Sequence, residues 1–239
     1  AFEGLLEEAV RAARKVDDVE AAAALQAAIE AGETPAEVRG PAEEALSALK
    51  EQRYADAERA FRQAVGAAPR SPLAREGVRV AEIRREAAEQ DALRALRKGG
   101  ASAERAVDVL AQSFALSPAN AAAREARSVL EERLDAPKRL SDAELAAVVG
   151  WLARLTELDD VARAKLEEGA DALEAGRFDA AEAAFAAAGA HPLARRARAA
   201  AKARLVGGLK GLAQGSATPE GADAIAKLLA ADPDDPMGQ

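Results

Sequence analysis

The feature that most constrains the fold of this chain is a spacing of aromatic and alanine residues that occurs twice. An aromatic residue, an alanine, a second aromatic residue and a second alanine follow one another, and these intervals place all four side chains on one face of an amphipathic helix. The first copy consists of Tyr54, Ala57, Phe61 and Ala64. The second copy consists of Phe178, Ala181, Phe185 and Ala188. Each copy is followed by a proline, so both helices are predicted to end there.

A second helix precedes the aromatic helix in both copies. Ala45 and Gly169 hold the same place in it, and Gly176 ends the later one just before Phe178. This pattern resembles the tetratricopeptide repeat (TPR), in which a small residue of the first helix faces the second helix. The resemblance is clearest over residues 42–70 and 162–192 and implies antiparallel helix pairs stacked into an α-solenoid. The chain departs from the family at Glu44 and Glu168, where a large apolar residue is usual.

Composition favours the same fold class. Of the 239 residues, 49% are hydrophobic but only 3% are aromatic, and much of the hydrophobic share is alanine. Alanine has the highest helix propensity and lets helix backbones approach closely. No alternating strand pattern is sustained, so we predict an all-α protein.

Read in order, the chain predicts a TPR-like solenoid of about six antiparallel helix pairs. We expect one helical-repeat domain over residues 1–231 and a disordered tail over 232–239. One helix is unusually long, because no helix breaker lies between Ser71-Pro72 and Gly99-Gly100. It should cover residues 72–98, a length of about 40 Å. After Pro192 a helix is predicted to about Ala213, and a last one after Thr218-Pro219.

Several helix boundaries follow from local signals. Thr34–Glu37 predicts a capping box, and Gly40-Pro41 should interrupt the helix that it opens. Ser117-Pro118 is predicted to begin a helix that runs to about Leu134. Ser141–Glu144 predicts a second capping box, for a helix through Leu158.

Charge and composition exclude several functions. The formal net charge is -8, which argues against nonspecific nucleic-acid binding, since phosphate contacts require a basic surface. The absence of cysteine removes thiolate metal sites and leaves the cellular compartment open. The longest apolar runs are too short for a transmembrane segment.

The sequence contains little that would support catalysis. His191 is the single histidine, in a turn before Pro192, with no second histidine or cysteine to complete a metal site. The pairs Asp17/Asp18 and Asp159/Asp160 precede helices and are predicted to cap them. The glycine-rich residues 207–211 follow no strand and lack the ending of a phosphate-binding loop. We therefore expect no metal, no cofactor and no enzyme activity.

The resemblance also implies a binding surface. In TPR proteins the first helices of the pairs line a concave groove. Carrying that register over to this chain places seven residues toward the groove: Arg39, Leu46, Leu49, Lys50, Arg163, Leu166 and Leu173.

A second candidate surface is basic. No acidic residue occurs from His191 to Pro219, and four basic residues gather on and beside one helix face: Arg195, Arg196, Arg198 and Lys202. Two interpretations stay open for this basic ridge. It is either a solvated helix face or a docking surface for an acidic partner or lipid headgroups.

These observations favour a non-catalytic scaffold that binds a protein or peptide segment in its concave groove. The alternative is a structural subunit of a larger assembly, which would contact its neighbours through the long helices. An enzyme is the third and weakest hypothesis. A scaffold should be monomeric in solution, whereas a subunit would tend to self-associate.

Overall fold

The computed structural model describes residues 2–31, 34–100 and 102–213, with side chains to residue 207. Within these ranges the chain forms eleven α-helices, one short 3₁₀ turn and no strand, which confirms the all-α prediction. The helix expected after Pro219 and the tail over 232–239 lie outside the described residues. The chain divides into two compact units, an N-terminal unit of Ala1–Ala126 and a C-terminal unit of Arg127–Gln239. A single domain over residues 1–231 stays a prediction.

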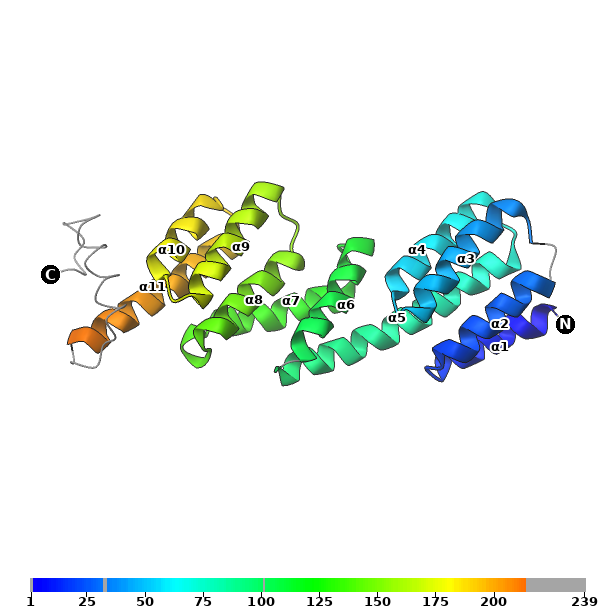
Figure 1. Cartoon of the computed structure of the whole chain (residues 1–239), viewed down its shortest axis with the longest axis horizontal. Helices are drawn as coiled ribbons and strands as arrows, with labels where there is room; N and C mark the ends of the chain where they lie inside the picture. The colour runs from blue at the N-terminus through cyan, green and yellow to red at the C-terminus, as the bar shows by residue number, and fades with distance from the viewer. Residues whose placement is uncertain (1, 32–33, 101, 214–239) are drawn as a thin grey trace. The chain divides into compact units, whose positions relative to one another are not determined.

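The N-terminal unit is built from consecutive helices that pack against one another (Figure 1). Its helices are α1 (Phe2–Arg14), α2 (Asp18–Ala31), α3 (Ala36–Lys50), α4 (Tyr54–Ala67), α5 (Pro72–Lys98) and α6 (Ser102–Leu116). Adjacent helices form the pairs α1/α2, α3/α4 and α5/α6. The helix α5 also packs against α1, α2 and α4, so this single helix contacts both of the preceding helix pairs of the unit.

The C-terminal unit repeats the same principle. It contains η1 (Pro137–Arg139), α8 (Asp142–Arg154), α9 (Asp160–Glu174), α10 (Phe178–Ala187) and α11 (Pro192–Ala213). Each of these α-helices packs against the next one along the chain. The helix α7 (Ala121–Leu134) contributes residues to both units.

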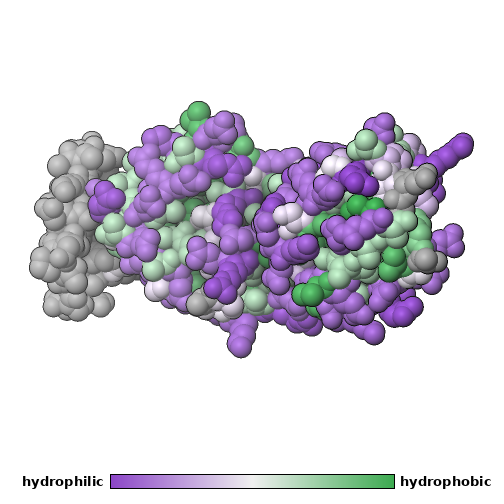
Figure 2. Space-filling model, turned by 45° about the vertical axis from the view of Figure 1, so that its right-hand side comes forward, coloured by the Kyte–Doolittle hydropathy of each residue, from purple (hydrophilic) through white to green (hydrophobic). Residues whose placement is uncertain are grey.

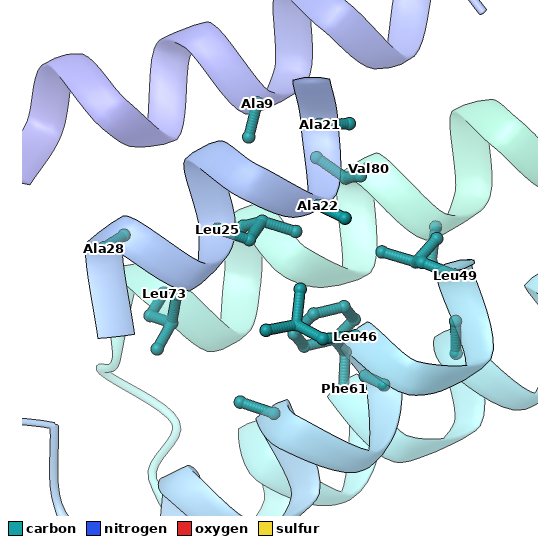
Figure 3. Packing of buried hydrophobic residues seen from close by; sticks show 14 of the residues in the cluster. Ala9, Ala21, Ala22, Leu25, Ala28, Leu46, Leu49, Phe61, Leu73 and Val80 are labelled. Atoms are coloured by element: carbon teal, nitrogen blue, oxygen red, sulfur yellow. The ribbon is translucent and has the colours of Figure 1, made fainter. Parts of the chain in front are cut away.

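Small side chains dominate the core of the N-terminal unit. Leucines and the Phe61 ring fill space that closely packed alanines leave (Figure 3). The residues shown there include Ala9, Ala21, Ala22, Leu25, Ala28, Leu46, Leu49, Phe61, Leu73 and Val80. Because alanine has no side-chain rotamers to lose, burying it adds no side-chain term to the entropy cost of ordering the backbone.

Several predicted boundaries are confirmed. The long helix covers Pro72–Lys98, and the Ser71 hydroxyl accepts a hydrogen bond from the Ala74 amide at 3.3 Å. At the start of α8 the capping box is present: Ser141 accepts from the Glu144 amide, and the Glu144 side chain accepts from the Ser141 amide. The helix predicted after Pro192 begins there and is described as far as Ala213, the last described residue, so its predicted end is not tested.

Other boundary predictions are wrong. No side chain caps the start of α3, and the helix continues through Gly40-Pro41 because packing of its apolar face outweighs the missing proline amide. The helix α7 begins at Ala121 rather than at Ser117, since the Asn120 side chain caps it instead. The helix α8 ends at Arg154, short of Leu158.

Two helix crossings depend on glycine. A Cβ atom added to Gly77 in α5 would lie 2.4 Å from the Phe61 ring of α4, and one added to Gly169 in α9 would lie 2.2 Å from the Phe185 ring of α10. Both distances are far below van der Waals contact, and both rings are fully buried. At each crossing, an aromatic ring of the facing helix therefore occupies the space that a side chain at the glycine would need.

We predict that Gly169→Ala lowers the stability of the protein although alanine favours helices. Overpacking against Phe185 should cost about 1–3 kcal/mol, more than the roughly 1 kcal/mol gained from helix propensity. The chemical-denaturation midpoint followed by circular dichroism measures the difference.

The matched control is Gly150→Ala in α8, where an added Cβ would meet nothing within 4 Å. This variant should be more stable than the wild type by about 0.5–1 kcal/mol. If both variants were stabilised equally, the close approach at Gly169 would be refuted.

Candidate functional site

The leucines of the predicted groove are not on the surface in this structure. Four of its apolar members are at most 2% exposed and belong to the cores of their units: Leu46, Leu49, Leu166 and Leu173. Such side chains contact neighbouring helices and offer no surface to a ligand. The reason is physical: in these units the first helices need the same leucines to pack against their partners.

The three charged members of the predicted groove behave differently. Arg39 and Lys50 are exposed on α3. Arg163 is half-buried, and its guanidinium donates a hydrogen bond of 2.8 Å to the Ala153 carbonyl at the end of α8. Arg163 therefore holds α9 to α8, and only Arg39 and Lys50 are available for a partner.

The basic ridge on α11 is largely paired with acids from other helices. Arg196 lies 2.9 Å from Glu131 of α7, and both Arg198 and Lys202 contact Glu182 of α10. Arg195 is exposed and has no ion-pair partner among the described residues. The sequence missed this neutralisation because the acids are distant in the chain.

A buried polar cluster of the N-terminal unit surrounds Arg84 of α5, which is only 4% exposed. Its Nε and Nη2 atoms both donate to the carboxylate of Asp18 at the start of α2, and Nη2 also donates to the Tyr54 hydroxyl at 3.0 Å. The Tyr54 hydroxyl donates to Asp18 at 2.7 Å, and the Arg84 guanidinium lies 5.0 Å from the centre of the Tyr54 ring. This cluster joins three helices, α2, α4 and α5.

The cluster raises the pKa values of Tyr54 and Arg84. Burial, followed by the hydrogen bond to Asp18, raises the pKa of Tyr54 to about 12. The hydrogen bond to Asp18 raises the pKa of Arg84 further above its ordinary value. The sequence had assigned Asp18 to helix capping, but Asp17 caps α2 through the Glu20 amide at 2.9 Å.

A cavity of about 390 Å³ lies beside this cluster. It is bounded by the turn before α4 and by the facing sides of α5 and α6. Its lining comprises Gln52, Tyr54, Arg84, Ala88, Asp91, Ala92, Ala95, Ser102, Arg105, Ala106 and Val109. The lining thus combines alanine and valine with polar side chains, and two guanidinium groups border the space.

A larger cavity of about 670 Å³ lies elsewhere in the N-terminal unit. It is bounded by Phe2, by Thr34-Pro35 and by residues 68–72 before α5, together with Leu73. Its lining is mostly apolar, and Arg70 is the one charged residue among the described residues that line it. The smaller cavity therefore has the more specific chemistry.

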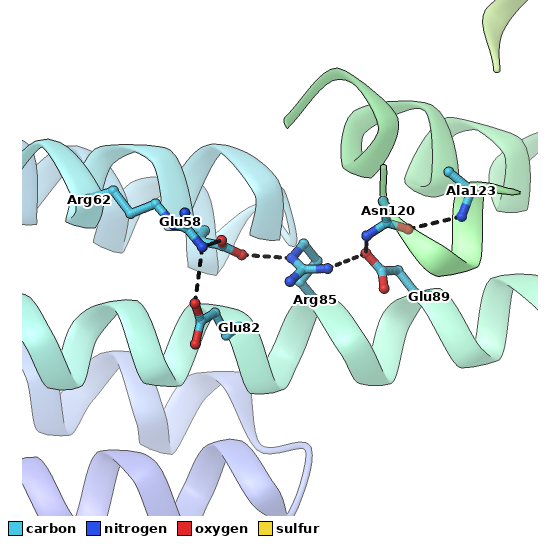
Figure 4. Close-up of polar contacts among 7 residues, drawn as sticks. All are labelled: Glu58, Arg62, Glu82, Arg85, Glu89, Asn120 and Ala123. Carbon is cyan, nitrogen blue, oxygen red and sulfur yellow. Dashed lines mark hydrogen bonds and ion pairs between the residues drawn. The ribbon is translucent and has the colours of Figure 1, made fainter. Parts of the chain in front are cut away.

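A second buried polar network lies on another side of α5 (Figure 4). Glu58 of α4, 1% exposed, accepts a hydrogen bond of 2.6 Å from Arg85. Arg85 also donates to Glu89, which accepts a second bond of 2.9 Å from the Asn120 side chain. Since the Asn120 oxygen in turn accepts from the Ala123 amide at 2.9 Å, the network ties the start of α7 to α5.

The described residues offer no catalytic arrangement that we can identify. The Nδ1 atom of His191 accepts a hydrogen bond of 3.1 Å from the Leu193 amide, which is a local helix-start contact. Within the described part of the chain, no three metal-ligating side chains come together. None of the described helices combines the length and apolar character needed to cross a membrane.

Comparisons with known proteins give no match. Neither a protein-family model, nor a curated protein, nor a solved structure is significantly similar to this chain.

We predict that Tyr54, the single tyrosine of the chain, ionises with a midpoint near pH 12 in the folded protein. Absorbance at 295 nm reports tyrosinate directly, and the denatured chain should show a midpoint near 10. Because the folded pKa is the higher one, this contribution to stability is complete below about pH 10 and is lost as the pH rises toward 12. A folded-state midpoint near 10 would show that the hydroxyl is not buried in the cluster.

A further prediction concerns Asn120. Asn120→Ala removes both the helix cap and the donor to Glu89, so the free energy of unfolding should fall by about 1–3 kcal/mol. Asn120→Asp keeps a capping oxygen but brings a second carboxylate to Glu89, so it should restore little of the loss at neutral pH. Asn120→Ser, which keeps a cap without that charge, is the matched control and should lie above both in urea denaturation. An Asp variant as stable as the wild type would argue against the network.

Proposed function

We propose that this chain is a non-catalytic scaffold of TPR-like helix pairs that binds a segment of another protein. The observation that carries the proposal is the cavity between α5 and α6, whose lining combines alanine and valine with polar side chains and two arginines. A protein segment presents apolar, hydrogen-bonding and charged groups together, so a site of mixed character suits it better than a purely apolar small molecule.

The succession of helix pairs supports this proposal. Pairs α1/α2, α3/α4 and α5/α6 pack in order along the chain of the N-terminal unit. A surface made of packed helices is formed before the partner arrives, so binding need only order the partner segment. Stacking of all pairs into one solenoid is part of the proposal.

The proposal places the binding site at the cavity instead of at the predicted leucines. The cavity is bordered by second-half residues of α5, such as Ala92 and Ala95, and by α6. Arg39 and Lys50 on α3 stay candidates for contacts outside the cavity, because both are exposed.

A second candidate function is that of a structural subunit. Val16 and Val19, at the turn between α1 and α2, are 56% and 81% exposed. Figure 2 shows an apolar area on the N-terminal unit, at the right of the view, with polar side chains around it. Such an area would be covered if neighbouring molecules pack on this unit.

The experiment that tests the scaffold is a selection of random peptides displayed on phage against the immobilised chain. Selected peptides are then synthesised and titrated by calorimetry. We expect saturable one-to-one binding, and we expect Ala95→Leu, which fills the cavity, to weaken it at least fivefold. The control is Ala115→Leu on the exposed face of α6, which should bind like the wild type.

Two outcomes would contradict the scaffold. One is that no peptide is enriched over an unrelated helical protein. The other is concentration-dependent self-association in sedimentation velocity that Val16→Ser and Val19→Ser together abolish, which would favour the structural subunit.

A further inference from the structure

We propose that the cavity between α5 and α6 receives the carboxylate of an acidic side chain from the bound segment. This inference deepens the proposed function and rests on it. It starts from the side chains that border the cavity: Arg84, Arg105, Gln52 and Ser102 are hydrogen-bond donors, and the remaining walls are mainly alanine and valine.

The first observation is an unpaired nitrogen. Arg84 borders the cavity, and its Nη1 atom is buried without a hydrogen-bond partner among the described residues. The other two nitrogens of this guanidinium are engaged with Asp18 and Tyr54, which fix its position. A buried donor without an acceptor is unfavourable, so an oxygen placed there would be stabilised.

The second observation is an uncompensated charge. Arg105 of α6 borders the same cavity, is exposed, and has no ion-pair partner among the described residues. The one acid in the lining, Asp91, forms an ion pair with Arg94, which reduces its repulsion of an incoming anion. The local charge therefore favours a carboxylate, which two guanidinium groups can bind by charge-assisted hydrogen bonds.

The apolar walls select the source of the carboxylate. Ala88, Ala92 and Ala95 on α5 face Ala106 and Val109 on α6 across the space. The methylene groups of a glutamate side chain can contact these methyl groups, whereas inorganic phosphate or sulfate cannot. A carboxylate carried on a short aliphatic stem matches the cavity better than a free anion does.

The charge of the whole chain makes such a site selective. At a net charge of -8 the molecule repels acidic partners at long range. An acidic segment can then bind only where a local cationic site offsets this repulsion. Its affinity should fall as salt screens the Arg105 charge.

The test uses the ¹⁵N-labelled full chain and two small probes. N-acetyl-glutamate amide carries one carboxylate, and N-acetyl-glutamine amide is its neutral counterpart. We expect the glutamate probe to shift the amide signals of Ala88, Ala92, Ala95 and Val109 saturably. The glutamine probe should bind at least fivefold more weakly.

The matched variants are Arg105→Gln and Arg70→Gln. Both arginines are exposed in the N-terminal unit, but Arg70 does not line this cavity. Arg105→Gln should weaken binding of the glutamate probe at least fivefold, and Arg70→Gln should leave it unchanged. Equal binding of the two probes, equal effects of the two variants, or an absence of shifts at the cavity would each overturn the inference.

Inorganic phosphate is the third probe, and binding as tight as that of the glutamate probe would overturn the assignment to a side-chain carboxylate.

The peptide selection separates this inference from the proposed function. Peptides that bind equally well after Glu→Gln replacement would leave the scaffold standing and refute the carboxylate site. If the glutamate probe bound at the cavity but the selection enriched no peptide, the scaffold would be refuted and the carboxylate site would stand.

Discussion

The structure of the N-terminal unit depends on the continuity of one helix. Between Ser71 and Gly99 no residue breaks the hydrogen-bond ladder, so α5 extends over 27 residues. One part of it supplies core contacts to α1, α2 and α4, with Gly77 beneath the Phe61 ring, and a later part borders α6. The Arg84 cluster, the Glu89 network and the cavity all lie along this helix, because a straight rigid element can hold distant side chains in fixed relation.

The buried charges of α5 define how its neighbours are placed. A buried ion pair contributes little net stability, since desolvation offsets most of the attraction, but leaving one partner alone is costly. Arg84 therefore favours the single arrangement in which α2 and α4 bring Asp18 and Tyr54 to it. An alanine-rich core is weakly specific by itself, because its small side chains fit many helix offsets. Polar clusters of this kind supply the missing specificity.

The ion pairs and hydrogen bonds between helices also determine which charged groups are left without a partner. Once Asp18 and Tyr54 have engaged Arg84, its third nitrogen has no partner among the described residues. Arg84 and Arg105 both border the cavity between α5 and α6. On α11, by contrast, most of the basic ridge is balanced by acids of neighbouring helices. At the cavity, by comparison, Arg105 carries a charge that has no ion-pair partner among the described residues.

The sequence by itself determined the all-α class, the long helix and several caps, because helix periodicity, proline and capping residues act within a few positions of the chain. It even located Gly169 correctly as a crossing residue. It could not find the Asp18–Arg84 pair, the Asn120 cap or the cavity. The pair and the cavity join residues that are far apart in sequence and carry no local signal. The Asn120 cap is local, since it joins Asn120 to the Ala123 amide, but Ser117-Pro118 gave a competing signal for the start of the same helix. The leucines assigned to a groove proved to be core. Which face of each helix is buried was decided only by tertiary packing.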